Sequence, residues 1–465
     1  MWPTRYVRAM QHSRRPALPR RLTRFASALV ALAFASRTSA THAQGVPAQG
    51  TRPSPSAEGW DDRYDLVHGV SRARLTRIDS VLRDAVRREE VAGVVVLVLR
   101  DDSVVYERAE GWRDREQRVP MTTDALFRIA SQTKALTSVA TLMLLEEGRF
   151  TLTTPVARFM PTFARSQVAV RRDSGVVLEL ARRGVTMRDL LTHTAGLSYG
   201  TDAHVAERYR AKGLGPAAGM GWYTADKTEP ICVTMDTLGT LPLVAHPGER
   251  WVYGYNTDVL GCVVERASGV PLDRFLRERL TGPLGMHDTH FFVPPADRAR
   301  LVTVYRSTPN GRTERAPEDA RGQGHYVDGP RTSFAGGAGL VSTARDYARF
   351  LQMLAHGGRW ADRRYLSAHS VALMTTNQVG TLHGASLGFG LGFETVEQYG
   401  ASGLASPGTW GWGGAYGSNY KVDPAEGLVM VVMINQMPTT SDLVARVQAL
   451  VYAALEESRW PPPRR

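Results

Sequence analysis

Residues 126–150 read LFRIASQTKALTSVATLMLLEEGRF, a segment that combines a helical repeat with a serine placed three positions before a lysine. Apolar side chains recur in it at the spacing of one helix face: Ala135, Val139, Leu142 and Leu145. The pattern predicts a helix over residues 130–148. Ser131 and Lys134 fall in its first turn, where residues three apart lie on the same face.

The Ser131–Lys134 pair has the composition of a nucleophile and its base. A serine hydroxyl is a weak nucleophile and needs a base within hydrogen-bond reach. A lysine can be that base only when its amine is uncharged, a state that burial and the positive end of a helix both favour. The same helix start would present the Ser131 amide to developing negative charge, as half of an oxyanion hole. On spacing alone, a capping serine beside a solvated lysine remains an equal alternative.

Three other serines stand in patterns that compete with Ser131. Ser418 and Lys421 repeat the spacing, but they lie in a predicted strand, where an odd separation puts side chains on opposite faces. Ser198 and Ser386 each occupy a G-x-S-x-G pattern, which supports a nucleophile only on a tight turn from strand to helix. The first follows a helical segment and the second precedes a glycine-rich run. We therefore expect both to be loop residues.

Strand-like segments stand near both ends of the chain, and helical segments lie between them. The predicted strands cover residues 93–100, 103–111, 418–422 and 427–434. The predicted helices outside 130–148 include 71–90, 441–457 and one capped by Ser342. This order indicates one mixed sheet to which the two ends of the chain both contribute.

The first 43 residues have the order of a secretory signal. They contain eight arginines and no acid, with an apolar run at 25–35 and then small residues. We expect cleavage after Ala43 and export to the periplasm or beyond. The apolar run is too short for a stable membrane anchor, although a retained N-terminal anchor is the alternative. The rest divides into a flexible linker at 44–68, one folded domain at 69–459 and a C-terminal tail at 460–465.

Composition argues against several classes of function. The formal net charge of +12 comes largely from the eight arginines of the signal segment, and the remainder carries only +4, which does not favour nucleic-acid binding. The sequence has no metal-binding motif and no nucleotide-binding loop, so we expect no cofactor and no metal. Cys232 and Cys262 are the two cysteines. An exported chain could join them, or they could remain buried thiols.

Four further segments accompany 126–161 in a characteristic order. They are VTMRDLLTHTAGL (185–197), HPGERWVYGYNTDVLG (246–261), GGAGLVSTARDYARFLQML (336–354) and GWGGAYGSNYKVDPAEGLVMVVMINQ (411–436). Together the five segments resemble the serine β-lactamase-like hydrolases, which include penicillin-binding proteins, and among them the class C-like carboxylesterases called family VIII. The resemblance covers residues 70–458. It implies an α/β fold: an antiparallel sheet flanked by helices, with a largely helical inserted subdomain and the active site between the two.

The resemblance assigns roles to the residues around the nucleophile. Ser131 matches the acyl-accepting serine, Lys134 its general base, and Tyr253 the catalytic tyrosine of the family's Y-x-N box. Tyr255 stands where that box usually has asparagine, and we expect it to contact substrate. The spacing from Trp251 favours Tyr253 over Tyr255 as the catalytic tyrosine. The alternative is that both tyrosines only pack in the core.

The family's third box is represented by Trp412, Gly413 and Gly414, which we expect to bind substrate. The Ala415 amide is then the expected second oxyanion donor beside Ser131. Trp412 replaces a cation that in β-lactamases helps to hold the substrate carboxylate, which favours neutral, apolar acyl esters. His193 is expected to be structural, as it is in the family. Trp222 and Tyr223 are candidates for the lining of the acyl pocket.

The resemblance implies a serine hydrolase that cleaves carboxylic esters through a covalent acyl-enzyme. Its partner would be a small-molecule ester or amide. Three alternatives stay open: a β-lactamase or peptidoglycan DD-peptidase, an acyltransferase with the same apparatus, and a catalytically silent binding protein of the same fold. The sequence leaves the acyl chain length, the physiological substrate and the oligomeric state undetermined.

Overall fold

The structure, a computed structural model, describes residues 66–173, 175–215, 227–319 and 323–460. The predicted signal segment, nearly all of the linker, and Trp222 and Tyr223 lie outside the described residues, so the expectations for them stay predictions. Among the described residues, no helix is both long enough and apolar enough to cross a membrane.

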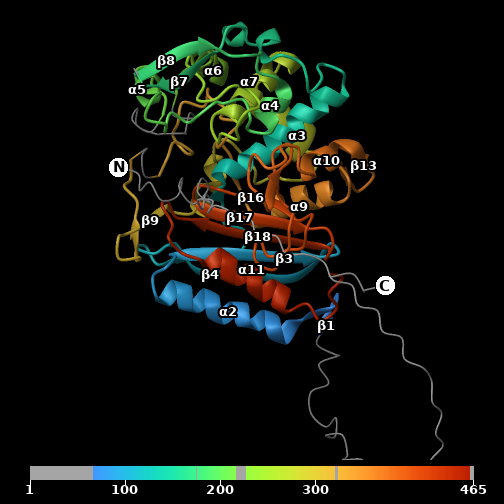
Figure 1. Ribbon diagram of the computed structural model, residues 1–465. Helices are drawn as coiled ribbons and strands as arrows, with labels where there is room; N and C mark the ends of the chain where they lie inside the picture. The colour runs from blue at the N-terminus through green and yellow to red at the C-terminus, as the bar shows by residue number, and fades with distance from the viewer. Residues whose placement is uncertain (1–65, 174, 216–226, 320–322, 461–465) are drawn as a thin grey trace, which may run out of the picture. The chain divides into compact units, whose positions relative to one another are not determined.

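Within the described residues, an antiparallel eight-stranded sheet forms the centre of the fold (Figure 1). Its strands, in spatial order, are β14 (Leu387–Phe389), β15 (Glu394–Val396), β16 (Trp410–Gly413), β17 (Gly417–Asp423), β18 (Leu428–Asn435), β3 (Gly93–Arg100), β4 (Ser103–Asp114) and β5 (Val119–Pro120). The pairing of β18 with β3 joins the two ends of the chain, as expected. The antiparallel sheet implied by the resemblance is confirmed, whereas the mixed sheet inferred from element order is wrong.

Strand β3 explains why the sheet is covered on both faces. All eight of its residues are buried, and successive side chains point to opposite sides of a sheet. One alternate set packs into the main core: Val95, Leu97 and Leu99. The other set packs into a second core under two helices: Val94, Val96 and Val98. A run of valine and leucine without polar interruptions is what a strand buried on both faces requires.

Two helices from opposite ends of the chain cover the second core (Figure 1). They are α2 (Arg72–Arg87) and α11 (Leu443–Ala453). Ser71, the first residue of the predicted helix, caps α2, because its hydroxyl accepts a hydrogen bond from the Arg74 amide at 3.3 Å. Helix α11 begins two residues later and ends four residues earlier than the predicted range.

The main core lies on the other face of the sheet, against α3 (Thr133–Glu146) and α9 (Ala344–Ala355). A short 3₁₀ turn, η2 (Ala130–Gln132), leads into α3. The expected Ser342 cap of α9 is wrong. Thr343 caps the helix by accepting from the Asp346 amide, while Ser342 lies in β11 (Val341–Ser342), paired with β6 (Phe127–Arg128).

The inserted region between the two halves of the sheet is largely helical, as the resemblance implied, but it also contains a β-hairpin. The hairpin consists of β7 (Gln167–Arg172) and β8 (Gly175–Leu180). The helices and turns are η3 (Val156–Arg158), η4 (Pro161–Phe163), α4 (Met187–Leu191), α5 (Ala206–Arg210), α6 (Ile231–Gly239), α7 (Asn256–Ser268), α8 (Leu272–Leu276), the π-helical η6 (Arg277–Thr281) and η7 (Pro295–Arg300). The remaining elements are β1 (Leu66–Val67), β2 (Val70–Ser71), β9 (Tyr305–Ser307), β10 (Thr313–Arg315), β12 (Arg359–Trp360), β13 (Arg363–Arg364) and α10 (Ala368–Thr375).

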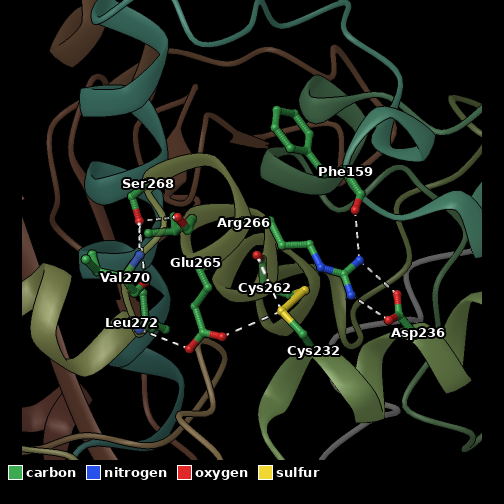
Figure 2. Close-up of a disulfide and its surroundings, with 10 residues drawn as sticks. Phe159, Cys232, Asp236, Cys262, Glu265, Arg266, Ser268, Val270 and Leu272 are labelled. Carbon is green, nitrogen blue, oxygen red and sulfur yellow. Dashed lines mark hydrogen bonds and ion pairs between the residues drawn. A yellow bond between two sulfur atoms is a disulfide. The ribbon is translucent and has the colours of Figure 1, made fainter.

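A disulfide between Cys232 and Cys262 joins α6 to α7 (Figure 2). This resolves the alternative that the sequence left open. Figure 2 also shows Arg266 of α7 bound to the Asp236 carboxylate of α6 and donating to the Phe159 carbonyl at 2.8 Å. A covalent bond and an ion pair therefore both tie α6 to α7, the helix whose N-terminal end adjoins the candidate site.

Candidate active site

Ser131 occupies the 3₁₀ turn η2, immediately before α3, and is half-buried. The preceding residue, Ala130, has a φ of 43°, in the left-handed region that alanine rarely adopts. Backbone strain of this kind persists only where the surroundings enforce it, and it is frequent at functional sites. The surroundings here are rigid, because residues 133–144 of α3 are all buried. The sequence predicted the shared turn of Ser131 and Lys134 but not its 3₁₀ geometry.

Lys134 is buried beside the Ser131 hydroxyl. Its Nζ lies 3.3 Å from Ser131 Oγ and donates to the Tyr199 hydroxyl at 2.9 Å and to the Gly337 carbonyl at 2.6 Å. Only 2% of the residue is exposed. The alternative of a solvated lysine is therefore wrong. The amine is therefore within reach of the hydroxyl that a general base would have to deprotonate.

Tyr253, rather than Tyr255, faces the serine. Its hydroxyl donates to Ser131 Oγ at 2.7 Å and accepts from Trp412 Nε1 at 3.2 Å. Lys134 Nζ lies 4.9 Å from the centre of its ring. Tyr255, by contrast, has no exposed surface, and its hydroxyl accepts from the Gly215 amide at 3.1 Å. The expectation that Tyr255 contacts substrate is not supported, because its side chain packs in the core behind the site.

The His193 ring packs against the Tyr253 ring. The two rings lie 4.9 Å apart, and His193 Nδ1 lies 2.8 Å from the side-chain amide of Asn256. Burial, aided by the nearby Lys134 charge, holds the pKa of His193 well below its usual value. A neutral, buried imidazole in this position orients aromatic neighbours, which agrees with the structural role expected from the sequence.

Tyr199 is the side chain of the site that sequence reasoning missed. It accepts the hydrogen bond from Lys134, and its ring packs edge-on against Tyr253 with centroids 5.6 Å apart. Burial, together with the nearby Tyr253 and Asp258, raises the pKa of its phenol well above the usual value, so it stays protonated. Its only marker in the sequence is the G-x-S-x-G pattern, which drew attention to Ser198 instead.

The end of β16 passes directly beside the serine turn. A Cβ on Gly414 would stand 2.5 Å from the Ile129 carbonyl oxygen, so only glycine permits this approach. Ala415 packs in a small apolar cluster with Ala130. The chain thus brings the expected second oxyanion donor to the start of η2. Gly413 is half-buried at the same strand end.

Trp412 belongs to an apolar aromatic shell around Tyr253. Its ring lies 5.5 Å from both Tyr253 and Phe389, and Trp251 stacks on Tyr253 at 5.7 Å with an interplanar angle of 15°. His383 also packs against Trp251. The rings of Trp251, Phe389 and Trp412 are uncharged, so the described part of this shell is mainly apolar.

The competing serines have other partners. Ser198 donates to the Asp202 carboxylate at 2.6 Å, and Ser386 donates to the Gln398 side chain at 2.9 Å. Ser418 donates to a backbone carbonyl of β18, whereas Lys421 reaches Ser402 instead. Nothing in these surroundings resembles the lysine and tyrosine that adjoin Ser131. In the part of the chain that the structure describes, no group of three His, Cys, Asp or Glu side chains is placed to hold a metal ion.

Comparison with known proteins shows the family to which the chain belongs. The model of the family described as Beta-lactamase matches residues 78–454, so the chain belongs to that family. It is 35% identical over 373 residues to Protein Rv1367c of Mycobacterium tuberculosis (76% of this chain, 87% of that one) and 32% identical to Esterase EstB of Burkholderia gladioli (77% and 90%). Among solved structures it is similar to "EstCE1, a hydrolase with promiscuous acyltransferase activity", at 27% identity and a TM-score of 0.68 (83% and 99%).

The fold itself is widely shared. Simvastatin synthase (LovD) from Aspergillus terreus superposes with a TM-score of 0.69 at 23% identity, covering 84% of this chain and 99% of that one. The fold implied by the resemblance is thus confirmed. The chain is a member of a β-lactamase-fold family that includes serine esterases and acyltransferases.

Proposed function

We propose that this protein cleaves carboxylic esters through an acyl-enzyme formed on Ser131. The observation that carries the proposal is the convergence on one hydroxyl of two proton-handling groups: Lys134 Nζ at 3.3 Å and the Tyr253 hydroxyl at 2.7 Å. A serine needs such a base to become a nucleophile. Intact geometry of this kind also argues against a catalytically silent binding protein.

Acylation begins with attack of Ser131 Oγ on the ester carbonyl carbon, while the Ser131 proton passes to the Lys134 amine. The carbonyl oxygen becomes an oxyanion that accepts hydrogen bonds from the Ser131 and Ala415 amides. One such donor is typically worth about 10²–10³ in rate. The carbon–oxygen bond to the alcohol then breaks. Tyr253 gives its proton to the departing alkoxide and regains one from the Lys134 ammonium.

Deacylation reverses these proton movements. As a water molecule attacks the acyl carbon, it gives a proton to Tyr253, which passes its own proton to the Lys134 amine; the Lys134 ammonium then returns a proton to Ser131 Oγ as it leaves. If an alcohol takes the place of water, the same steps transfer the acyl group. EstB and EstCE1, both similar to this chain, are described as an esterase and as a hydrolase with promiscuous acyltransferase activity. Acyl transfer is therefore the second candidate function.

A neutral, apolar ester is the proposed substrate class. The aromatic shell of Trp251, Phe389 and Trp412 carries no positive charge to pair with a substrate carboxylate. Efficient β-lactam hydrolysis is for this reason not the function that we favour.

Turnover of p-nitrophenyl acetate and butyrate tests the proposal. We expect hydrolysis of both esters, a mass increase of one acyl group on the peptide that contains Ser131, and loss of both in Ser131→Ala. Full activity of Ser131→Ala would overturn the assignment. Nitrocefin turnover faster than ester turnover would favour a β-lactamase. The ratio of acid to new ester in the presence of added alcohol separates hydrolysis from acyl transfer.

A further inference from the structure

Asp258 is a carboxylic acid with no exposed surface, in the first turn of α7. Its Oδ1 accepts a hydrogen bond from the Gly337 amide at 3.1 Å. Its Oδ2 is buried and has no hydrogen-bond partner within the described part of the chain. Burial of an incompletely bonded carboxylate costs free energy of folding. A role in the candidate site would account for an acid in this position.

Gly337 links this carboxylate to the catalytic centre. Its amide binds Asp258, and its carbonyl accepts from Lys134 Nζ at 2.6 Å. A Cβ on residue 337 would stand 2.3 Å from Asp258 Oδ2, so a glycine is needed for the carboxylate to lie this close. One residue therefore connects the acid and the amine through its own backbone.

The electrostatic surroundings of Asp258 also connect it to Lys134. Burial raises the pKa of Asp258 to about 6. The positive charge of Lys134 on α3 and the hydrogen bond from the Gly337 amide both act to lower this pKa. The other ionisable groups that face it are phenols: Tyr199 interacts with it directly, and Tyr253 and Tyr255 adjoin Tyr199. Above pH 6, Asp258 is therefore a negative charge that acts on a lysine that must accept a proton.

We propose that Asp258 is a positioning residue for Lys134: through Gly337 it holds the amine toward Ser131, and its carboxylate balances the ammonium that forms when Lys134 takes the Ser131 proton. The inference rests on the proposed function, in which Lys134 is the base. Asp258 exchanges no proton with substrate in this scheme. It acts as the buried acid of a serine–histidine–aspartate triad acts on its histidine, by orienting the base and stabilising its charged form.

The test uses Asp258→Asn and the rate at which a fluorophosphonate labels Ser131 between pH 5 and 8.5. The asparagine keeps the shape and the acceptor for Gly337 but removes the charge. We expect labelling at pH 8 to be slower by about tenfold, less than the roughly 10²–10⁴-fold effect of a group that itself transfers a proton, because Asp258 acts only through Lys134. The ratio of wild-type to variant rates should fall toward one as the pH drops through about 6, because the wild-type carboxyl is then protonated as well.

Glu265→Gln is the matched control. Glu265 lies on the same helix and also accepts a backbone amide, that of Leu272 at 3.0 Å, but it lies beside the Cys232–Cys262 disulfide (Figure 2), and the charges that act on it are those of Asp273 and Arg266. Its variant should label at the wild-type rate at every pH. A wild-type rate for Asp258→Asn, or a slower rate whose ratio to wild type does not change with pH, overturns the proposal.

A second variant decides the question if Asp258→Asn does not fold. Gly337→Ala retains Asp258 but displaces its carboxylate from the amide of residue 337, so labelling of Ser131 should slow as well. An unchanged rate in the folded variant would contradict the role of Gly337 as the connection between Asp258 and Lys134. The two proposals fail separately. Ester turnover that depends on Ser131 but not on Asp258 overturns only this inference, whereas a wild-type protein that is never labelled overturns both.

Discussion

Arg100 and Lys134 are both buried basic residues, but their surroundings differ. Arg100, at the end of β3, is 1% exposed and binds the Glu426 carboxylate at 3.3 Å and the carbonyls of Gly69 and Glu457. Lys134 is 2% exposed, and its hydrogen bonds among the described residues go to uncharged oxygens. Arg100 is thus half of a buried ion pair, whereas Lys134 contacts the candidate nucleophile and has no carboxylate as a direct hydrogen-bond partner among the described residues.

The two residue types also differ in chemistry, because an arginine stays protonated in proteins whereas a buried lysine can lose its proton. Arg100 joins β3 to residues 426 and 457 near the C-terminal end, and its role is structural. Lys134 contacts the candidate nucleophile. We therefore expect replacement of Lys134 to lower mainly the activity and replacement of Arg100 to lower mainly the stability.

The largest effect is expected for Lys134→Met, which replaces the amine by an apolar chain of similar length. Ester turnover should fall by about 10³-fold, because Ser131 loses its base. Steady-state kinetics with p-nitrophenyl butyrate measures this, with a urea titration to verify folding. A variant that retains more than a tenth of the wild-type rate would show that Lys134 is no different in kind from Arg100.

Arg100→Met should act on stability instead. Removal of one partner leaves the Glu426 carboxylate buried and uncompensated, which typically costs about 3–5 kcal/mol. We expect a lower urea midpoint with an unchanged rate of Ser131 labelling in the folded protein. The double variant with Glu426→Gln should recover part of the lost stability. A strong fall in the rate of Ser131 labelling in folded Arg100→Met would contradict a purely structural role for Arg100.

The smallest effect is expected for Trp412→Phe, which keeps an aromatic ring but removes the Nε1 donor to Tyr253. One hydrogen bond is worth about 0.5–1.5 kcal/mol, so kcat should fall by roughly two- to tenfold with little change in KM. Pre-steady-state measurement of the acylation burst assigns the loss to acylation or deacylation. An unchanged kcat would mean that the indole donor does not tune Tyr253.

Much of the fold could be predicted because its signals are local or continuous. The unbroken apolar run of β3, the capping serine of α2 and the order of the five family segments all predict elements that the structure contains. The errors have local causes too. Thr343 rather than Ser342 caps α9, since two neighbouring hydroxyl residues offer the same chemistry and the backbone geometry chooses between them.

The site was harder to predict than the fold. Tyr199 had no motif of its own, and Asp258 appeared only within a quoted segment without a role. Tyr253 and Tyr255 stand two positions apart, and only the spacing from Trp251 favoured Tyr253 as the catalytic tyrosine. The turn before α7 directs one toward Ser131 and the other into the core, and no periodic pattern distinguishes them.

The amino-acid order by itself determined that Ser131 and Lys134 meet, because residues three apart in one helical turn share a face whatever surrounds them. Only the tertiary structure decided that the amine is buried and oriented. Its other contacts come from Tyr199 and Gly337, 65 and 203 positions away, and the tyrosine at the hydroxyl comes from 122 positions away. Such contacts depend on how the sheet and the helical insertion pack together, which short-range spacing does not encode.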